Sequence, residues 1–436
     1  MNAPAAPATR GQVWAWGLWD WGSAAFNAVI LTFVFSRYLV EGVADDPVRA
    51  TSLLGWTLGA AGLLVALAAP VVGQRADGAG RRRRSVAAWT ALTVLSMAAM
   101  FAVVDDHAYL ALGLGLLALG SVTFEFATVS YYAMLRQVST PATIGRVSGF
   151  GWALGYFGGI VLLSLVYFGL VAGEGGLLGV PTEDGLNIRV VALVAAVWFA
   201  LFALPMLLVV PELPPAADLP ARAGVLASYR TLVADLRALL RTDRHTVYFL
   251  LASALFRDGL GAIFTFGAII AAAYGIGADD VLLFGIAANV IAGLGALVGG
   301  RLDDRIGPKA VIVGSLVGIL LVGSVLMVLS GPVAFWTGGL ALTLFVGPAQ
   351  SSSRAFLARL APPGREGQLF GLYATTGRAV SFLAPSLVGL FTFLFDSTRA
   401  GMAGILVVIA IGLAALWRVR PPAATHPRGD AQAARV

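Results

Sequence analysis

The sequence predicts an all-α membrane protein whose twelve transmembrane helices form two pseudo-symmetric six-helix bundles. Three observations carry this prediction. Hydrophobic residues make up 58% of the 436 residues and charged residues only 12%, which is about half the charged fraction of a soluble globular domain. Apolar runs long enough to cross a bilayer occur twelve times. A glycine-bent loop with five arginines, at 73–85, returns in altered form at 300–309, at a constant offset of 227 residues.

Each predicted helix is an apolar run of roughly 20 residues, the length that spans the hydrocarbon core of a membrane. In the first half these runs lie at 13–39, 51–72, 85–104, 108–134, 146–171 and 188–210. In the second half they lie at 246–273, 279–299, 310–329, 332–355, 367–394 and 399–418. The chain thus divides into an N-terminal tail (1–12), a first bundle (13–210), a cytoplasmic linker (211–245), a second bundle (246–418) and a disordered C-terminal tail (419–436).

The positions of the arginines predict the orientation of the helices. If the chain starts inside, 23 Lys and Arg residues fall in cytoplasmic segments. Only four fall outside: Arg37, Arg49, Arg189 and Arg399. Because Lys and Arg near the ends of transmembrane helices are retained in the cytoplasm, we expect both termini there and the protein in the cell membrane.

The linker is predicted to contain an amphipathic helix. Prolines end the sixth transmembrane helix, and apolar residues then recur every three or four positions with arginines among them. They are Val225, Tyr229, Leu232, Leu236 and Leu239. This pattern is typical of a helix that lies in the headgroup layer, and a regulatory contact is the alternative interpretation.

Several kinds of site lack the residues they need. The chain has no cysteine, and its three histidines, His107, His245 and His426, fall in loops or tails without the spacing of metal ligands. The single lysine, Lys309, is not preceded by a phosphate-binding glycine-rich loop. The basic residues are scattered over short loops, which argues against a nucleic-acid partner. We therefore expect no enzyme activity, no metal and no cofactor.

Five ionisable residues lie inside the predicted helices, where each costs about 2.5 to 3.5 kcal/mol to insert. They are Asp20, Glu125, Arg257, Asp258 and Arg378. Such residues mark candidate solute or ion paths, and the alternative for each is a structural ion pair between helices. Since three acids face two bases, one carboxylate left without a partner could carry a proton.

Two asparagines join this set. Asp20, Ser23 and Asn27 share one stripe of the first helix, because residues three or four apart lie on the same face. Asn27 is expected near mid-depth, and Asp20 closer to the cytoplasm, in an intracellular gate or in the path itself. Asn289 lies within about two turns of the middle of the eighth helix.

The repeated loop and the twelve helices resemble the major facilitator superfamily of transporters. Its signature between helices two and three is matched by Gly73, Asp77, Gly80, Arg81 and Arg82, and in the second copy by Gly300, Asp304, Arg305 and Gly307. Gly78 stands where the signature has a basic residue, and Pro308 replaces one of its final basic pair. The resemblance implies that this loop gates the cytoplasmic opening through aspartate and arginine contacts across the two halves.

Four further stretches, at 16–35, 145–163, 249–267 and 347–385, resemble the subfamily of major facilitators related to the fungal autophagy-linked vacuolar amino-acid effluxers. This resemblance covers nearly all twelve helices. It implies export of small solutes, which are amino acids in the fungal members. Arg257 departs from the uncharged residue expected before Asp258.

We therefore expect a monomeric secondary transporter that works by alternating access, with its solute near mid-depth between the halves. Helices one, four, seven, eight and eleven are expected to line the path. Arg257 or Arg378 would hold a carboxylate, because a guanidinium offers two parallel hydrogen bonds. Asp258 or Glu125 would take an amine or a coupled proton.

Two alternatives to an amino-acid exporter remain open. An effluxer of lipophilic drugs or antibiotics is favoured if the cavity is mostly aromatic and its charges are paired. A non-transporting membrane sensor on the same fold is the other alternative.

Overall fold

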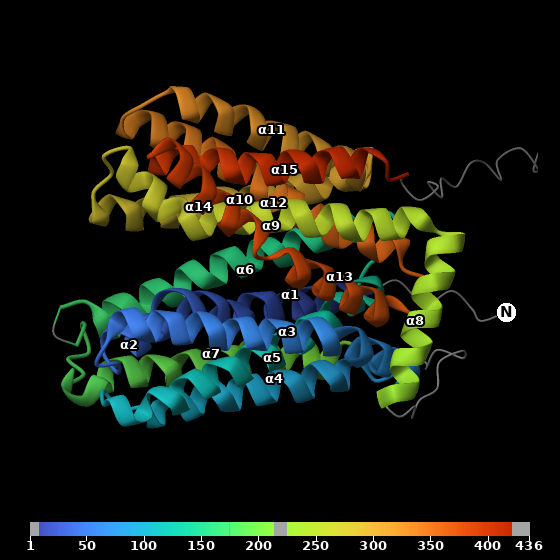
Figure 1. Cartoon of the computed structure of the whole chain (residues 1–436). Helices are drawn as coiled ribbons and strands as arrows, with labels where there is room; N and C mark the ends of the chain where they lie inside the picture. The colour runs from blue at the N-terminus through green and yellow to red at the C-terminus, as the bar shows by residue number, and fades with distance from the viewer. Residues whose placement is uncertain (1–7, 174, 213–224, 421–436) are drawn as a thin grey trace, which may run out of the picture.

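The computed structural model describes residues 8–173, 175–212 and 225–420, and these residues are almost entirely helical. Twelve of the described helices are long and apolar enough to cross a membrane, so the predicted all-α membrane fold is confirmed. Figure 1 shows the two bundles, one in blue and green and the other in yellow to red, with their helices roughly side by side.

The first bundle comprises α1 (Arg10–Ala24), which runs through the π-helical segment Ala25–Phe33 into α2 (Phe35–Glu41), then α3 (Pro47–Ala79), α4 (Arg82–Ala99), α5 (Leu110–Ala133), α6 (Ile144–Val166) and α7 (Leu186–Val209). The second bundle comprises α9 (Arg244–Ala273), α10 (Ala278–Ile306), α11 (Pro308–Val328), α12 (Pro332–Leu360), α13 (Glu366–Val380) with α14 (Leu383–Phe395), and α15 (Gly401–Trp417). The predicted N-terminal and C-terminal tails lie largely outside the described residues.

The two copies of the repeated loop turn the chain at the same place. Gly80 ends α3 in the left-handed conformation, with φ 61°, and Gly307 separates α10 from α11 with φ 87°. Residues with a Cβ rarely adopt positive φ, so glycine is the residue that permits each turn. The 227-residue repeat in the sequence is therefore a repeat of helix, glycine turn and helix.

Two of the described spans are divided between two α-helices. In the first, the backbone shifts to π-helical bonding, and the amide of Val34 donates to the carbonyl of Val29, 2.9 Å away. In the eleventh, α13 ends at Val380 and α14 begins at Leu383. Pro385 in the first turn of α14 has no N–H to donate, which favours a break at this point.

The halves meet most closely at one end, where α1 begins and α15 ends. We call it the termini end. Here α3 packs against α13 and α6 against α10. A Cβ on Gly73 would overlap the carbonyl oxygen of Gly367, and one on Gly149 would overlap that of Ala296. Glycine allows the backbones to approach this closely, so the termini end is closed.

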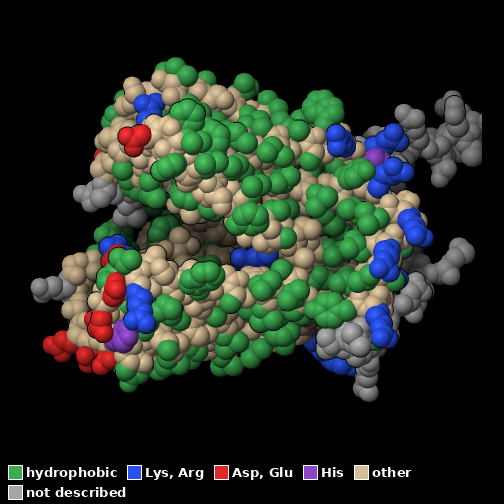
Figure 2. Space-filling model, viewed as in Figure 1, with side chains coloured by type: hydrophobic (Ala, Val, Ile, Leu, Met, Phe, Trp, Pro, Cys, Tyr) green, Lys and Arg blue, Asp and Glu red, His purple; other side chains and the backbone are tan. Residues whose placement is uncertain are grey.

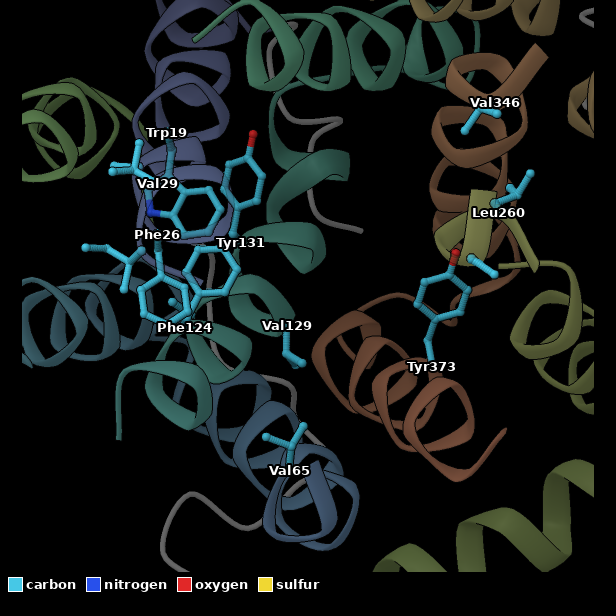
Figure 3. Packing of buried hydrophobic residues seen from close by; sticks show 14 of the residues in the cluster. Trp19, Phe26, Val29, Val65, Phe124, Val129, Tyr131, Leu260, Val346 and Tyr373 are labelled. Carbon is cyan, nitrogen blue, oxygen red and sulfur yellow. The ribbon is translucent and has the colours of Figure 1, made fainter. Parts of the chain in front are cut away.

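An aromatic column gives the first bundle a rigid core. Trp19 stacks on Tyr131 with ring centroids 4.1 Å apart, and Phe26 stacks on Phe124 at 5.1 Å. Figure 3 shows these four side chains between the first span and α5. Stacked aromatic pairs add about 0.5 to 1.5 kcal/mol each beyond their buried area, so α1 and α5 are expected to move as one unit.

The linker contains a single described helix, α8 (Val225–Thr242), which crosses the termini end of the molecule (Figure 1). The Tyr229 hydroxyl donates to the Leu67 carbonyl of α3 at 2.8 Å. On the other side, Asp235 pairs with Arg365 at 2.9 Å and accepts from the Gln368 amide at 2.9 Å. This helix therefore contacts both halves, and the part of the linker at 213–224 lies outside the described residues.

Candidate functional site

A cavity of about 1260 Å³ lies between the two halves. It runs from the middle of the molecule towards the end opposite the termini end, because Arg37 and Glu41 of α2 line its mouth and Asp20 lies at its base. Figure 2 shows the hollow between the halves, left of centre. The described residues around it come from the first, fourth, fifth, sixth, seventh, eighth, ninth, tenth and twelfth spans.

The helices around the cavity differ in part from those expected. The first, fourth, seventh and eighth spans contribute, as the sequence led us to expect. Among the described residues, the eleventh span contributes none, while the fifth and tenth contribute several. The reason is that α13 is packed against α3, on another side of the interface between the halves.

An ion pair closes the base of the cavity. Arg354 of α12 is 1% exposed, and its guanidinium lies 3.1 Å from the carboxylate of Asp20 on α1. Arg354 also donates to the hydroxyl and carbonyl oxygens of Ser148 on α6, at 3.0 and 2.7 Å. The Tyr131 hydroxyl donates to Asp20 at 2.9 Å. This network ties the second bundle to the first directly beneath the cavity.

Aromatic rings surround the buried guanidinium. The Arg354 Cζ lies 4.9 Å from the ring centroid of Tyr132 and 5.0 Å from that of Trp16. Ring faces attract a desolvated cation, by about 2 kcal/mol or more. Arg354 lies one residue before the end of the expected tenth helix and was counted among the 23 cytoplasmic Lys and Arg residues, so its buried position was not predicted. One feature of the sequence could have predicted a longer helix. No proline or glycine lies between Arg354 and Pro362, so the tenth helix could continue past Arg354.

Amide and hydroxyl groups line the cavity above this base. Asn27 lies in the π-helical segment of the first span and is exposed to the cavity. Asn289 of α10 also lines it and donates to the Gly285 carbonyl at 2.8 Å. Across the halves, the Tyr156 hydroxyl of α6 donates to the Gln350 side-chain oxygen of α12 at 3.2 Å. Tyr156 and Gln350 were not singled out in the sequence, because uncharged polar residues are common in such helices.

Glu125 and Arg378 form an ion pair with each other that joins α5 to α13 across the halves. Neither is among the residues that line the cavity. Their side chains are 25% and 38% exposed, so the pair is only partly enclosed by protein.

Arg257 and Asp258 flank the break in the eleventh span. The Arg257 guanidinium lies over the ring of Tyr373 on α13, 3.7 Å from its centroid, and donates to the Tyr373 carbonyl at 3.5 Å. The Asp258 carboxylate accepts from the backbone N–H of Ala384, at 2.7 Å, in the first turn of α14. A carboxylate that accepts from a free N–H at the start of a helix caps that helix. Neither Arg257 nor Asp258 lines the cavity.

The first copy of the repeated loop forms an ion network across the halves. Asp77 lies 2.6 Å from Arg82, and Arg82 lies 2.5 Å from Glu366 of α13. Glu366 also pairs with Arg136 at 3.3 Å. Asp77 accepts in addition from the backbone N–H of Gln368 at 2.9 Å. Because Asp77, Arg82 and Glu366 are all buried, the network depends on the two halves remaining together.

The second copy forms a related network. Asp304 of α10 accepts from the backbone N–H groups of Gly145 and Arg146 on α6, at 2.8 and 3.2 Å. Arg359 lies 2.5 Å from Asp303 and 3.6 Å from Asp304. Gly300 packs on the backbone of Gly145. The remaining basic residues of the motif, Arg81 and Arg305, are exposed.

Among the described residues, no group of three or more His, Cys, Asp or Glu side chains is placed to hold a metal ion.

Comparisons with known proteins agree with the fold. Residues 42–426 match the family model described as "Vacuole effluxer Atg22 like". An uncharacterised MFS-type transporter, YxiO, from Bacillus subtilis is 25% identical over 407 residues, which cover 92% of this chain and 93% of YxiO. Autophagy-related protein 22 of Cryptococcus neoformans is 26% identical over 302 residues, and the match covers 64% of this chain and 53% of that protein.

Two solved structures show the same fold. The proton:xylose symporter XylE has a TM-score of 0.72 at 14% identity, covering 93% of this chain and 94% of XylE. The transporter FucP, in its outward conformation, has a TM-score of 0.72 at 12% identity, covering 94% of this chain and 99% of FucP. The resemblance stated from the sequence is confirmed, and the protein is not an enzyme. The chain belongs to the family of Atg22-like effluxers, within the major facilitator superfamily of secondary transporters.

Proposed function

We propose that this protein exports small amphipathic solutes, above all amino acids with apolar side chains, by alternating access. The observation that carries the proposal is that the cavity combines apolar walls with a few uncharged polar side chains. Its walls are mostly apolar, and the polar groups of Asn27, Asn289, Tyr156 and Gln350 project from both halves. Amides and hydroxyls can bind both the ammonium and the carboxylate of a zwitterion, while the walls accept an apolar side chain.

The two arginines that were expected to bind a carboxylate do not line the cavity, and this affects the choice of solute. Arg378 is bound to Glu125, Arg257 lies against α13, and neither lines the cavity. We therefore assign solute contact to the neutral polar groups in this state. A free guanidinium in the cavity would select anions, and without one a neutral zwitterion is the better fit.

The orientation follows from the distribution of charge. Lys and Arg side chains gather at the termini end on the face shown in Figure 2, and Asp and Glu gather mostly at the other end. By the positive-inside rule the termini end faces the cytoplasm. The cavity then opens away from the cytoplasm, and the two ion networks close the cytoplasmic side. We propose this orientation for a monomer in the cell membrane.

Asp20 is our candidate for the coupling proton. It is the one acid of the predicted set that both lines the cavity and bonds across the halves. A proton that enters from outside and binds the Asp20 carboxylate removes the charge that Arg354 faces. This weakens the bond between α1 and α12, which allows the cytoplasmic side to open and to load a solute. Proton entry is thereby coupled to solute exit.

The test uses purified protein in proteoliposomes loaded with labelled amino acids, with and without an imposed pH gradient. We expect efflux of apolar amino acids that accelerates with the gradient. Asn289→Ala and Asn27→Ala should each raise the KM about fivefold, the loss of roughly one hydrogen bond. Thr337→Ala, on the exposed side of α12, is the control and should leave the KM unchanged. Absence of efflux for every amino acid would overturn the proposal.

The apolar walls also favour a second candidate, the efflux of lipophilic drugs or antibiotics. The same proteoliposomes separate the two. A lipophilic fluorescent substrate that is transported while amino acids neither move nor compete would favour the drug effluxer. Competition by apolar amino acids against the fluorescent substrate would instead show that both share the cavity.

A further inference from the structure

A second pocket lies at the termini end, outside the central cavity. Its volume is about 430 Å³, and it is formed by the start of α1, the start of α6 and the end of α10. Three arginines line it, and they come from both halves: Arg10 of α1, Arg146 of α6 and Arg301 of α10. Neither ion network of the repeated loop accounts for all three.

The pocket carries excess positive charge. Arg146 is paired with Asp304 at 3.3 Å, and Asp304 is shared with Arg359. Arg301 donates only to the Leu297 carbonyl of its own helix, at 3.2 Å. Within the described part of the chain, neither Arg10 nor Arg301 has an ion-pair partner. Three guanidinium groups around one shared carboxylate favour an anionic ligand.

Apolar surface continues from the pocket along α10 towards the middle of the membrane. Leu294, Val298 and Arg301 lie four and three residues apart and so share a helix face. Leu294 and Val298 are 46% and 63% exposed. On the opposite wall, the exposed Trp14 packs edge-on against Phe150, with ring centroids 4.6 Å apart. A ligand held here would have an anionic head at the arginines and an apolar chain along α10.

We propose that this pocket binds the headgroup of an anionic phospholipid. Basic pockets between transmembrane helices on the cytoplasmic side suit acidic lipid headgroups, and each Lys or Arg near an anionic membrane surface contributes about fivefold in affinity. A guanidinium can bind a phosphate through two parallel hydrogen bonds. The apolar face below the arginines distinguishes a lipid from free phosphate, which would use the head site alone.

The bound lipid would stabilise the state with the cytoplasmic side closed. Arg10 and Arg146 belong to the first half and Arg301 to the second, so the pocket exists only while α6 and α10 remain in contact at this end. A ligand that binds one conformation better shifts the population towards it. This consequence rests on the proposed alternating access, whereas the lipid site itself does not.

The experiment counts bound lipid by native mass spectrometry of the full chain, taken from nanodiscs of phosphatidylcholine with or without phosphatidylglycerol. We expect the wild type to retain one phosphatidylglycerol. Arg301→Gln should lower its affinity about fivefold, and Arg10→Gln with Arg301→Gln about 25-fold. Arg244→Gln is the matched control, an exposed arginine that begins α9 at the same end, and it should retain the lipid.

Equal retention by the double variant and the wild type would overturn the proposal. So would displacement of phosphatidylglycerol by inorganic phosphate at millimolar concentration, which would show a free-anion site. Thermal unfolding in phosphatidylcholine alone tests whether the variants fold, and equal midpoints for all four proteins are expected. A loss of transport with normal lipid retention would count against the proposed function and leave the lipid site standing.

Discussion

Arg354 and Asp20 meet beneath the central cavity, with 3.1 Å between guanidinium and carboxylate, although 334 residues separate them in the chain. The arginine is almost fully buried, and the carboxylate faces the cavity. The bond therefore connects the central cavity to the contact between the halves. Under the proposed mechanism, we expect a change at the carboxylate to affect the closure of the opposite side through Arg354.

Asp20→Asn imitates the protonated carboxylate and should remove the dependence of transport on the pH gradient. The amide can still accept from Tyr131, but it no longer carries the charge that Arg354 faces. We expect efflux at a rate that is the same with and without the gradient, measured in proteoliposomes. Asp106→Asn is the control, since Asp106 is exposed at the far end of the molecule. A variant that keeps the full gradient dependence would exclude Asp20 as the proton carrier.

Arg354→Gln should destabilise the cavity-open state by about 3 to 5 kcal/mol, because a buried charge would lose its partner. The full sequence has no cysteine, so a cysteine introduced in place of the buried Ser351 is the only thiol that a reagent can label. We expect thiol reagents on the cytoplasmic side to label Ser351→Cys rapidly when Arg354→Gln is present and slowly when Arg354 is retained in the otherwise unchanged chain. Labelling that stays slow would show that other contacts hold the cytoplasmic side closed.

Arg82→Gln should open the cytoplasmic side as well, through a different network. Arg82 bridges Asp77 and Glu366 and is 4% exposed, so its loss leaves two buried carboxylates facing each other. Labelling of Ser351→Cys should rise at least tenfold. Arg84→Gln, two residues on, is the control, because the Arg84 side chain is exposed and only its backbone N–H bonds to Glu212. Equal labelling in both variants would contradict a gating role for Arg82.

The sequence predicted the fold well because lipid imposes a simple rule. Every backbone polar group must be satisfied inside the membrane, so an apolar run of sufficient length is a helix. The repeat of Gly80 at Gly307 marked the turn that each half needs. The stripe of Asp20 and Asn27 was likewise readable, since helical spacing fixes which residues share a face.

The partners of the charged residues were not readable from the sequence. Arg354 lies one residue before the end of the expected tenth helix, 332–355, and was counted among the cytoplasmic arginines of the loop that follows, whereas α12 continues to Leu360. With Arg354 inside the molecule, the count of three acids and two bases no longer identifies a carboxylate without a partner. The Asp258 carboxylate accepts a hydrogen bond from a backbone N–H, and no sequence pattern predicts this partner. Pairing between helices depends on their rotation and depth, which composition does not specify.

Asp258→Ala should lower the free energy of unfolding by about 1 to 2 kcal/mol, the cost of losing a helix cap. Asp258→Asn should lose less, because the amide oxygen can still accept from Ala384. Thermal unfolding in a neutral lipid or detergent measures both. Ser381→Ala is the control at the same break, since its hydroxyl bonds only to the Arg378 carbonyl in the preceding turn. If alanine and asparagine at 258 proved equally harmless, the cap would not stabilise α14.

Glu125 and Arg378 permit a test that separates a structural ion pair from a solute site. If the pair is structural, Glu125→Gln and Arg378→Gln should each destabilise the protein, and the double variant should recover part of the loss. Because both side chains are partly exposed, we expect a coupling energy of no more than about 1 kcal/mol. If Arg378 instead binds a solute carboxylate at another stage of the cycle, Arg378→Gln should raise the KM for amino acids, while Glu125→Gln should not. Thermal unfolding and efflux kinetics on the three variants decide between these outcomes.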